Sequence, residues 1–535
     1  MARDLQQAID RTIGVFPETS KMVFEWWDHI IFAVLTLASA AAIAYVLRSW
    51  FAFGDQYSTP LIFWPLTLIL LGRLGVNQLR WWVLPFMRRP EATRPPPNLR
   101  VGVATTFVPG AEPIEMLEET VAALVAMDYP HDTWVLDEGD DPKVKELCSR
   151  LGALYFSRKA MPRYQAAEGA FKAKSKHGNY NSWFQEIAYG RYEFISTFDP
   201  DHIPKPTFLS SVLGYFDDPE IGYVQTPQAY YNQNASFIAR GAAEETYAYY
   251  SSTEMFCHAM GYPIVVGCHS THRVSALKEI GGYPAHDAED LLLTILYRSS
   301  GWRGVYLPEI LARGITPVDW DGYLTQQLRW ARSVLDIKFR IFPKLAGRLE
   351  FKELVTGILH GFYYLQGLTM LLALLTLIAM LVTGRFPRLI NYSMLSNMAV
   401  LAGVFLLCEF YRQRFYIGRR SEWGVHWRAG LLQIAKWPYL LVALYHVVID
   451  KRVPYVITSK TSDGSKRHWA LMPHWISAAA IGAAWLFALI AGYAMHPLIH
   501  ILAAASIAGF LILASTEFIK FPEPYTPKRS RRPDG

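Results

Sequence analysis

Phe-Ile-Ser-Thr-Phe-Asp-Pro-Asp-His, residues 194–202, is a β-rich apolar run that ends at two carboxylates, Asp199 and Asp201. Such a run, followed by turn-forming Asp and Pro, predicts a buried strand over 194–198. Two carboxylates at a strand end are well placed to hold a divalent cation, because Mg²⁺ and Mn²⁺ prefer oxygen ligands and share them with phosphate. An acidic turn is the ordinary alternative, and this pair alone is a weak signal.

Similar patterns surround this run. Residues 99–108, 133–136 and 153–157 are β-rich, and residues 113–127 have the pattern of an amphipathic helix. Strands that alternate with helices predict a doubly wound, mostly parallel α/β sheet. Such sheets bind their ligands at the carboxyl ends of the strands. The predicted strand at 133–136 also ends at acids, so both acidic clusters fall at this edge.

Apolar segments flank this polar middle on both sides. A membrane span needs about 20 apolar residues, and six runs approach that length: residues 30–47, 60–82, 355–382, 389–407, 470–493 and 498–514. Basic residues favour the loops of one side, which predicts that both termini and the polar middle are cytoplasmic. Segments 323–344 and 427–448 are predicted as interfacial helices. The second could instead span the membrane, and the C-terminus would then change side.

Composition agrees with a membrane protein. The chain has 535 residues, of which 52% are hydrophobic and 18% charged, with a net charge of +6. Lys and Arg cluster beside the apolar runs, which indicates membrane flanks and not nucleic-acid binding. The four cysteines form no CxxC pair and show no zinc-ligand spacing, which is typical of scattered reduced cysteines.

We therefore expect an α-helical membrane protein with a cytoplasmic α/β domain. Five regions follow along the chain: an amphipathic segment with two transmembrane helices (1–96), the α/β domain (97–320), interfacial helices (321–350), four transmembrane helices with an interfacial helix and a loop at 454–466 (351–520), and a basic cytoplasmic tail (521–535).

Two further segments contribute polar groups to the domain. Residues 135–141 are Val-Leu-Asp-Glu-Gly-Asp-Asp, and Asp137 could accept hydrogen bonds from a base or a ribose. Residues 176–181 are Lys-His-Gly-Asn-Tyr-Asn, and Lys176 could face a diphosphate. A polar turn and an exposed lysine are the commoner interpretations of each segment alone.

The pair Glu289-Asp290 precedes the apolar run 291–296. Acids are common in the first turn of a helix for dipole reasons. The functional interpretation makes Asp290 a general base that takes a proton from an attacking hydroxyl.

Residues 326–330, Gln-Gln-Leu-Arg-Trp, lie in the predicted interfacial helix. Gln326, Arg329 and Trp330 share one face at helical spacing. Arg329 could neutralise a diphosphate and Trp330 could pack on a sugar ring, while an interfacial Arg and Trp without such roles are also common.

In this order, the motifs resemble the cellulose synthase-like branch of family-2 glycosyltransferases. The D, DxD, ED and QxxRW signature of that family corresponds to Asp137, residues 199–201, residues 289–290 and residues 326–330, and the flanking helices agree with its layout. The resemblance implies a GT-A fold for the cytoplasmic domain. It also implies inverting transfer of a hexose from a UDP-sugar.

The resemblance implies a role for each matching residue. Asp137, Lys176 and Asp199 would contact the UDP-sugar, Asp201 and Asp199 would hold Mg²⁺ or Mn²⁺, Asp290 with Glu289 would be catalytic, and Gln326, Arg329 and Trp330 would hold the acceptor end and the diphosphate.

Residues 455–460, Tyr-Val-Ile-Thr-Ser-Lys, are similar to the FxVTxK gating loop of cellulose synthases. By resemblance, Thr458 and Lys460 would close over the UDP-sugar. A short basic loop is the ordinary alternative.

The chain also departs from the family. Residues 267–273, Gly-Cys-His-Ser-Thr-His-Arg, replace a GSCAVLRR-like segment near the acceptor, so by position Cys268 and His269 would face the acceptor. We expect no control through a cyclic-di-GMP-binding domain.

The expected function is processive synthesis of a β-glucan, with translocation across a bacterial inner membrane. UDP-glucose is the favoured donor, with UDP-GlcNAc open, and the growing polysaccharide, membrane lipid and accessory export subunits are the expected partners, without nucleic acid. A non-processive transferase acting on a lipid or short acceptor is the alternative. A transporter with a cytoplasmic regulatory domain is a weaker alternative. It predicts charged residues inside several membrane spans, and Arg73 is the only clear candidate in the apolar runs.

Overall fold

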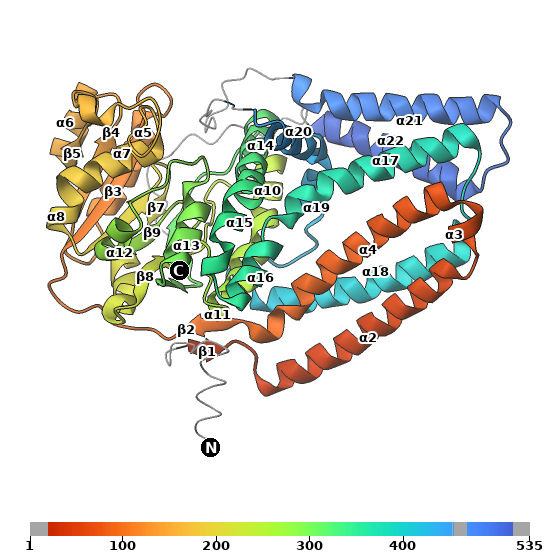
Figure 1. Cartoon of the computed structure of the whole chain (residues 1–535), viewed down its shortest axis with the longest axis horizontal. Coiled ribbons are helices and arrows are strands. Elements are labelled where there is room, and N and C mark those ends of the chain that lie inside the picture. The colour runs from red at the N-terminus through yellow and green to blue at the C-terminus, as the bar shows by residue number, and fades with distance from the viewer. Residues whose placement is uncertain (1–19, 452, 454–467, 517–535) are drawn as a thin grey trace.

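The computed structural model describes residues 20–451, 453 and 468–516. A mostly parallel seven-stranded sheet lies at one end of the molecule (Figure 1), with strand order β10-β8-β9-β6-β3-β4-β5. Of these seven, β9 alone runs antiparallel to its neighbours. The strands are β3 (Val101–Phe107), β4 (Asp132–Asp137), β5 (Leu154–Phe156), β6 (Phe194–Phe198), β8 (Ile221–Gln225), β9 (Ser270–Arg273) and β10 (Arg303–Tyr306).

Strand β6 has the bounds expected from its sequence, and all five of its residues are buried. It lies between β3 and β9. A strand covered on both faces needs a continuous run of β-prone residues and not an alternating one. The same reason explains β3, whose seven residues include six that are buried.

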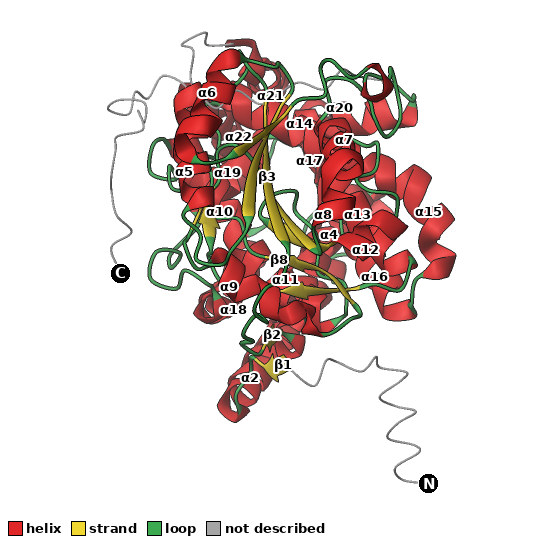
Figure 2. Cartoon of the chain, turned by 90° about the vertical axis from the view of Figure 1, so that its left-hand side faces the viewer, coloured by secondary structure: helices red, strands yellow, loops and turns green. Residues whose placement is uncertain are grey.

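Helices cover both faces of the sheet, as Figure 2 shows. On one face, α5 (Ile114–Val125) and α6 (Pro142–Leu151) place Leu117, Val121 and Leu147 in a shared core with the strands. On the other, α7 (Lys176–Trp183), α12 (Val274–Glu279) and α13 (Glu289–Ser299) bury Trp183, Leu277 and Leu293. The predicted doubly wound α/β fold class is confirmed.

Strand β9 was not expected, because Ser-Thr-His-Arg has no β-rich apolar pattern. Its side chains are buried as polar pairs: Thr271 Oγ1 lies 2.8 Å from Ser196 Oγ, and His272 Nδ1 lies 3.1 Å from the Tyr297 hydroxyl. Buried polar groups are tolerated where they find partners across the strands. This antiparallel strand brings residues 267–269 to the carboxyl end of β6.

Long apolar helices run side by side in the other half of the molecule (Figure 1). Within the part of the chain that the structure describes, six helical stretches are long and apolar enough to cross a membrane, by length and composition, and each overlaps one predicted run. Their outward side chains include Leu37, Leu61 and Ile490, which are 72%, 90% and 78% exposed. The six stretches are formed by α2 (Trp26–Phe51), α4 (Pro60–Trp82), α16 (Phe351–Leu359) together with α17 (Gln366–Thr383), α18 (Tyr392–Arg412), α21 (Met472–Ile490) and α22 (Pro497–Ser515).

Between the sheet and this bundle lie α10 (Phe237–Ala248), α14 (Trp320–Asp336), α19 (Trp427–Ala435) and α20 (Trp437–Val448). The last two form one apolar pair bent by 45°, which by length and composition fits a broken seventh span or a re-entrant segment, and their interfacial placement stays a prediction. At the bend, the buried Lys436 Nζ lies 2.8 Å from Glu245 Oε1 and donates to Gln327 Oε1 at 3.1 Å. The bend is therefore tied to α10 and α14.

The remaining short elements connect these parts. They are β1 (Ser20–Met22), β2 (Arg88–Pro90), β7 (Ile203–Pro204), β11 (Ala312–Arg313), α3 (Asp55–Ser58), α8 (Tyr189–Arg191), α9 (Phe208–Val212), α11 (Glu254–Ala259) and α15 (Phe342–Leu345).

Candidate active site

Lys176 joins three segments at the carboxyl edge of the sheet. It is the first residue of α7, and its Nζ lies 2.7 Å from Asp199 Oδ1 and 3.4 Å from Glu289 Oε1. The same amino group donates to the Gly267 carbonyl at 2.7 Å. The Lys176 ammonium group therefore joins the end of β6, the start of α13 and the turn before β9.

The charge of Lys176 depends on these neighbours. Burial lowers the pKa of Lys176, but Asp199 and Glu289 outweigh it and hold that pKa well above its ordinary value. Lys176 is thus a cation at neutral pH. A cation at this position can also face a phosphate group.

Asp290 lies in the first turn of α13, packed against Gly267. A Cβ added to Gly267 would lie 2.7 Å from Asp290 Oδ2, and the φ of Gly267 is +80°, so both the space and the backbone require glycine. Burial, followed by repulsion from Glu289, raises the pKa of Asp290 to about 7. A carboxyl group poised near neutrality is suited to accept a proton from a hydroxyl.

Asp201 and His202 follow Asp199 and turn inward. Asp201 Oδ2 accepts a hydrogen bond from Ile315 N at 3.1 Å, and Oδ1 lies 3.3 Å from His202 Nδ1. One ligand atom from each of Asp199, Asp201 and His202 lies within 4.8 Å of the other two. This donor set, with two carboxylates, fits a divalent cation that prefers oxygen.

Cys268 and His269, expected beside the acceptor, are both fully buried. Gln228 Nε2 donates to Cys268 Sγ at 2.6 Å, and His269 Nδ1 lies 2.9 Å from Thr226 Oγ1. Both side chains therefore point into the domain. This burial does not favour direct contact of either side chain with an acceptor.

Asp137 ends β4 and is fully buried. Its Oδ1 accepts from Gly139 N at 2.8 Å, and its Oδ2 accepts from Asp141 N at 2.5 Å and from the Tyr155 hydroxyl at 2.9 Å. The carboxylate thus closes the turn that follows its strand. Since β3 separates β4 from β6, this turn is about 10 Å across the sheet from the end of β6.

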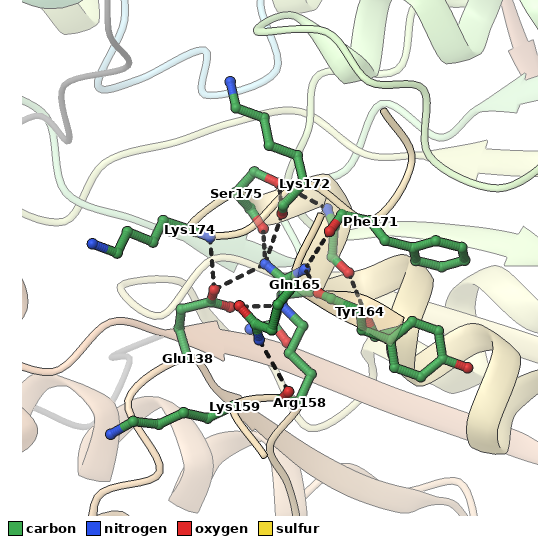
Figure 3. A network of polar contacts seen from close by, with 12 residues as sticks. Glu138, Arg158, Lys159, Tyr164, Gln165, Phe171, Lys172, Lys174 and Ser175 are labelled. Carbon is green, nitrogen blue, oxygen red and sulfur yellow. Dashed lines mark hydrogen bonds and ion pairs between the residues drawn. The ribbon is translucent and has the colours of Figure 1, made fainter. Parts of the chain in front are cut away.

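A buried guanidinium, Arg158, fixes the loop between β5 and α7 (Figure 3). Its Nε and Nη2 donate to the two Glu138 oxygens at 3.0 and 2.9 Å. Its Nη1 and Nη2 also donate to the carbonyls of Tyr164 and Lys172, each at 3.0 Å. Because this loop leads directly into α7, the Arg158–Glu138 pair positions the backbone that carries Lys176.

Replacing Arg158 by Met is expected to destabilise the protein by about 3 kcal/mol or more, because the substitution leaves Glu138 and several carbonyls without their donor. Thermal unfolding of the full chain, followed by intrinsic fluorescence, should show a clearly lower midpoint. The matched control in the same loop is Arg163→Met, which breaks the 2.6 Å pair of the 66% exposed Arg163 with Glu186, a residue of the helical turn after α7. That pair should contribute less than about 1 kcal/mol. Equal decreases of the unfolding midpoint in the two variants would contradict the role of Arg158 in fixing this loop.

The helix α14 carries Gln326, Arg329 and Trp330, all half-buried. One turn further along, Arg332 forms an ion pair with Asp287, which lies three residues before Asp290. The start of α13 and the helix with the Gln-Gln-Leu-Arg-Trp segment are therefore held together.

Thr458 and Lys460 lie outside the described residues.

Sequence reasoning missed two residues that organise the site. Gly267 carries a local signal, because an isolated glycine before a strand indicates a turn or a close backbone approach. Arg158 carries none, because its partners are a carboxylate 20 residues earlier and the carbonyls of an irregular loop.

The match to a family model falls on the α/β domain and extends to α14. A family model described as "Glycosyltransferase like family 2" matches residues 102–333. The cellulose synthase catalytic subunit (UDP-forming) of Pseudomonas fluorescens is 26% identical over 324 residues, which are 58% of this chain and 41% of that protein. Cellulose synthase 1 of Komagataeibacter xylinus is 27% identical over 286 residues, which are 50% of this chain and 17% of that protein. The matches thus span less than half the length of these relatives.

Similar solved structures are more distant. A mannosyltransferase from Pyrobaculum calidifontis, in complex with GDP-Man and Mn²⁺, is 18% identical with a TM-score of 0.43, covering 78% of this chain and all of that one. Glucosyl-3-phosphoglycerate synthase from Mycobacterium tuberculosis is 16% identical with a TM-score of 0.29, covering 43% of this chain and 79% of that one.

Proposed function

We propose that this chain, whose residues 102–333 are a cellulose synthase-like glycosyltransferase domain of family 2, transfers a hexose from a UDP-sugar to a growing β-glucan. Glucose is the hexose we favour. The observation that carries the proposal is Asp290, a carboxyl with a pKa of about 7 at the same sheet edge as the Lys176–Asp199 ion pair. A base and a cationic group for a leaving diphosphate are the two parts that such a transfer needs.

The chemistry is a direct displacement. Asp290 accepts the proton of the acceptor hydroxyl while that oxygen attacks the anomeric carbon, and the bond to the UDP oxygen breaks with inversion. Lys176 and Arg329 supply positive charge for the departing diphosphate. Asp137 and Asp199 contact the UDP portion, Gln326 and Trp330 hold the acceptor end, and Thr458 and Lys460 close over the donor.

Asp199 and Asp201 hold a divalent cation in this proposal. Their oxygens, with His202 close by, form a donor set that fits Mg²⁺ or Mn²⁺. When bound, such an ion neutralises charge that develops on the diphosphate. Ile315 N and His202 fix the orientation of the Asp201 carboxylate before any cation binds.

A small cavity of about 30 Å³ lies beside Gln228, whose Nε2 donates to Cys268 Sγ. We propose that the polymer leaves through the helical bundle of a bacterial inner membrane, with the α/β domain in the cytoplasm and accessory export subunits as possible partners.

The pH dependence of transfer follows from Asp290. As the base must be ionised, kcat/KM should rise about tenfold per pH unit up to pH about 7 and then level off. If the carboxyl had an ordinary pKa, this rising limb of the pH profile of kcat/KM would lie near pH 4. In Glu289→Gln the limb should move to lower pH, because one cause of the raised pKa is removed. In Glu279→Gln, a change of an exposed carboxylate, it should not move. A pH-independent rate between pH 5 and 8 would contradict the assignment.

Product length tests processivity. Membranes containing the chain are incubated with radiolabelled UDP-glucose or UDP-GlcNAc, and the products are sized before and after digestion with linkage-specific β-glucanases. We expect a long, glucanase-sensitive polymer from UDP-glucose. Only singly glycosylated lipids or short acceptors would overturn processivity and favour the non-processive alternative.

A further inference from the structure

Three ligand-type side chains converge beside the end of β6. His202 follows the Asp199–Asp201 pair, while Cys268 and His269 form the turn into β9. One ligand atom from each of His202, Cys268 and His269 lies within 4.8 Å of the other two, and the two imidazole centroids are 5.1 Å apart. All three side chains are more than nine-tenths buried.

Each imidazole uses its Nδ1 in a contact of 3.3 Å or less, and the His202 ring also interacts with the Cys268 side chain. His202 Nδ1 faces Asp201 Oδ1 at 3.3 Å, and His269 Nδ1 faces Thr226 Oγ1 at 2.9 Å. The Nε2 atoms of both rings are buried and have no hydrogen-bond partner among the described residues. Buried nitrogens without partners are rare, and an ion is one of the causes. Metal-bound histidines commonly donate their other nitrogen to a carboxylate or another oxygen in this way.

The space around His202 Nε2 is compatible with a ligand. A Cβ added to Gly314 would lie 2.3, 2.4 and 2.7 Å from Nε2, Cε1 and Cδ2 of that ring. Three such similar distances mean that the added Cβ would lie above the plane of the His202 ring. A Cβ in the ring plane, along the Nε2 lone pair, would be clearly farther from Cε1 and Cδ2 than from Nε2. The lone-pair direction therefore lies away from Gly314.

Cys268 and His269 show two further features of a built site. The sulfur of Cys268 accepts an N–H from Gln228, which is the type of second contact that stabilises a metal-bound thiolate. His269 has a φ of +36°, which is uncommon for a residue other than glycine. Backbone outliers of this kind persist where surrounding structure fixes them, often at functional sites.

We propose that His202, Cys268 and His269 bind a divalent transition-metal ion of the zinc class. Two imidazoles and one thiolate form a softer donor set than Mg²⁺ prefers, and they match three of the four ligands of a tetrahedral zinc site. Ligands 2.0 to 2.3 Å from a tetrahedral ion lie about 3.3 to 3.8 Å apart. The observed atoms, which lie within 4.8 Å of one another, therefore need to approach one another by at most about 1.5 Å.

This ion would have a positioning role. It would join the segment after β6 to the turn before β9, which contains Gly267. The Gly267 carbonyl accepts from Lys176, and its Cα faces Asp290. The site shares His202 with the donor set of Asp199 and Asp201, but its other two donors are a thiolate and an imidazole instead of carboxylates. It does not depend on the proposed sugar transfer.

Metal content and cobalt spectroscopy of the full chain test the proposal. The protein is purified in detergent with reductant and without chelator, and its zinc is measured by mass spectrometry. It is then reloaded with Co²⁺ in the absence of any UDP-sugar. We expect one tightly held zinc per chain and, with Co²⁺, a near-ultraviolet thiolate-to-cobalt absorption band. A chain without stoichiometric zinc that also gives no such band would overturn the proposal.

Matched variants assign the ligands. Cys268→Ser should abolish the thiolate band, and His269→Asn, which tolerates a positive φ, should weaken Co²⁺ binding at least tenfold. Cys148→Ser removes another buried cysteine, in α6, and should leave the band intact. Asp199→Asn should also keep the band, since Asp199 is not among the three proposed ligands. A band that survives Cys268→Ser, or one lost equally in Cys148→Ser, would contradict the assignment.

Discussion

An Asp290→Asn variant is expected to lose sugar transfer by about 10²- to 10⁴-fold, the range that a general base contributes. Asparagine keeps the shape of the side chain and an oxygen that can accept from Leu291 N, as Asp290 Oδ1 does at 2.7 Å. It cannot take a proton from the acceptor hydroxyl. The loss should therefore appear in kcat, measured as UDP release from UDP-glucose.

Binding of the donor separates this role from a structural one. UDP affinity of Asp290→Asn, measured by calorimetry with Mg²⁺ present, should stay within about twofold of wild type, since the proposed role of Asp290 is at the acceptor. Glu279→Gln, the exposed control at the end of α12, should change neither quantity. Near-wild-type turnover in Asp290→Asn would refute the base, and a parallel loss of UDP binding would indicate a damaged fold.

Chelation of divalent cations is expected to stop transfer by about 100-fold or more, because a cation on a leaving diphosphate contributes several kcal/mol. EDTA-treated protein should regain activity with Mg²⁺ or Mn²⁺. Asp201→Asn should show the same deficit without chelation, and excess Mg²⁺ should restore it only weakly. Unchanged turnover after chelation would remove the proposed cation from Asp199 and Asp201.

This experiment also distinguishes the two cation sites. EDTA can remove an ion from His202, Cys268 and His269 as well, and such an ion would not be replaced by Mg²⁺. Full recovery with Mg²⁺ alone would show that the zinc-class ion is either retained or unnecessary for turnover. Recovery that requires both metals would show that the turn at Gly267 needs its own ion.

The parts of the fold that the sequence predicted best are those with continuous apolar runs. Strand β6 has the expected bounds, and the six apolar runs overlap the six membrane-length stretches among the described residues. Burial in a sheet and burial in lipid both demand continuous apolar residues. Strand β9 lacks that pattern. Its Ser, Thr and His side chains are buried through partners on β6 and α13, and such pairing depends on contacts far away in the sequence.

The active site likewise combines residues that the sequence predicted with contacts that it could not predict. The order of Asp137, Asp199, Asp290 and Gln326 along the chain indicated a transferase, and a family-2 glycosyltransferase model matches residues 102–333, with cellulose synthase subunits 26–27% identical. The pairing of Lys176 with Asp199 and Glu289 joins residues up to 113 positions apart, so no local pattern could predict it. The metal-type cluster was also hidden, because His202 is 66 residues from Cys268 and the spacing resembles no known ligand motif.

Turnover of radiolabelled UDP-glucose by the purified full chain, with Mg²⁺ and lipid, tests the central claim most directly. The account predicts equal amounts of released UDP and of label incorporated into a β-linked saccharide, with both lost in Asp290→Asn. Wild-type protein that binds UDP but neither releases it from UDP-glucose or UDP-GlcNAc nor labels any saccharide would contradict the account.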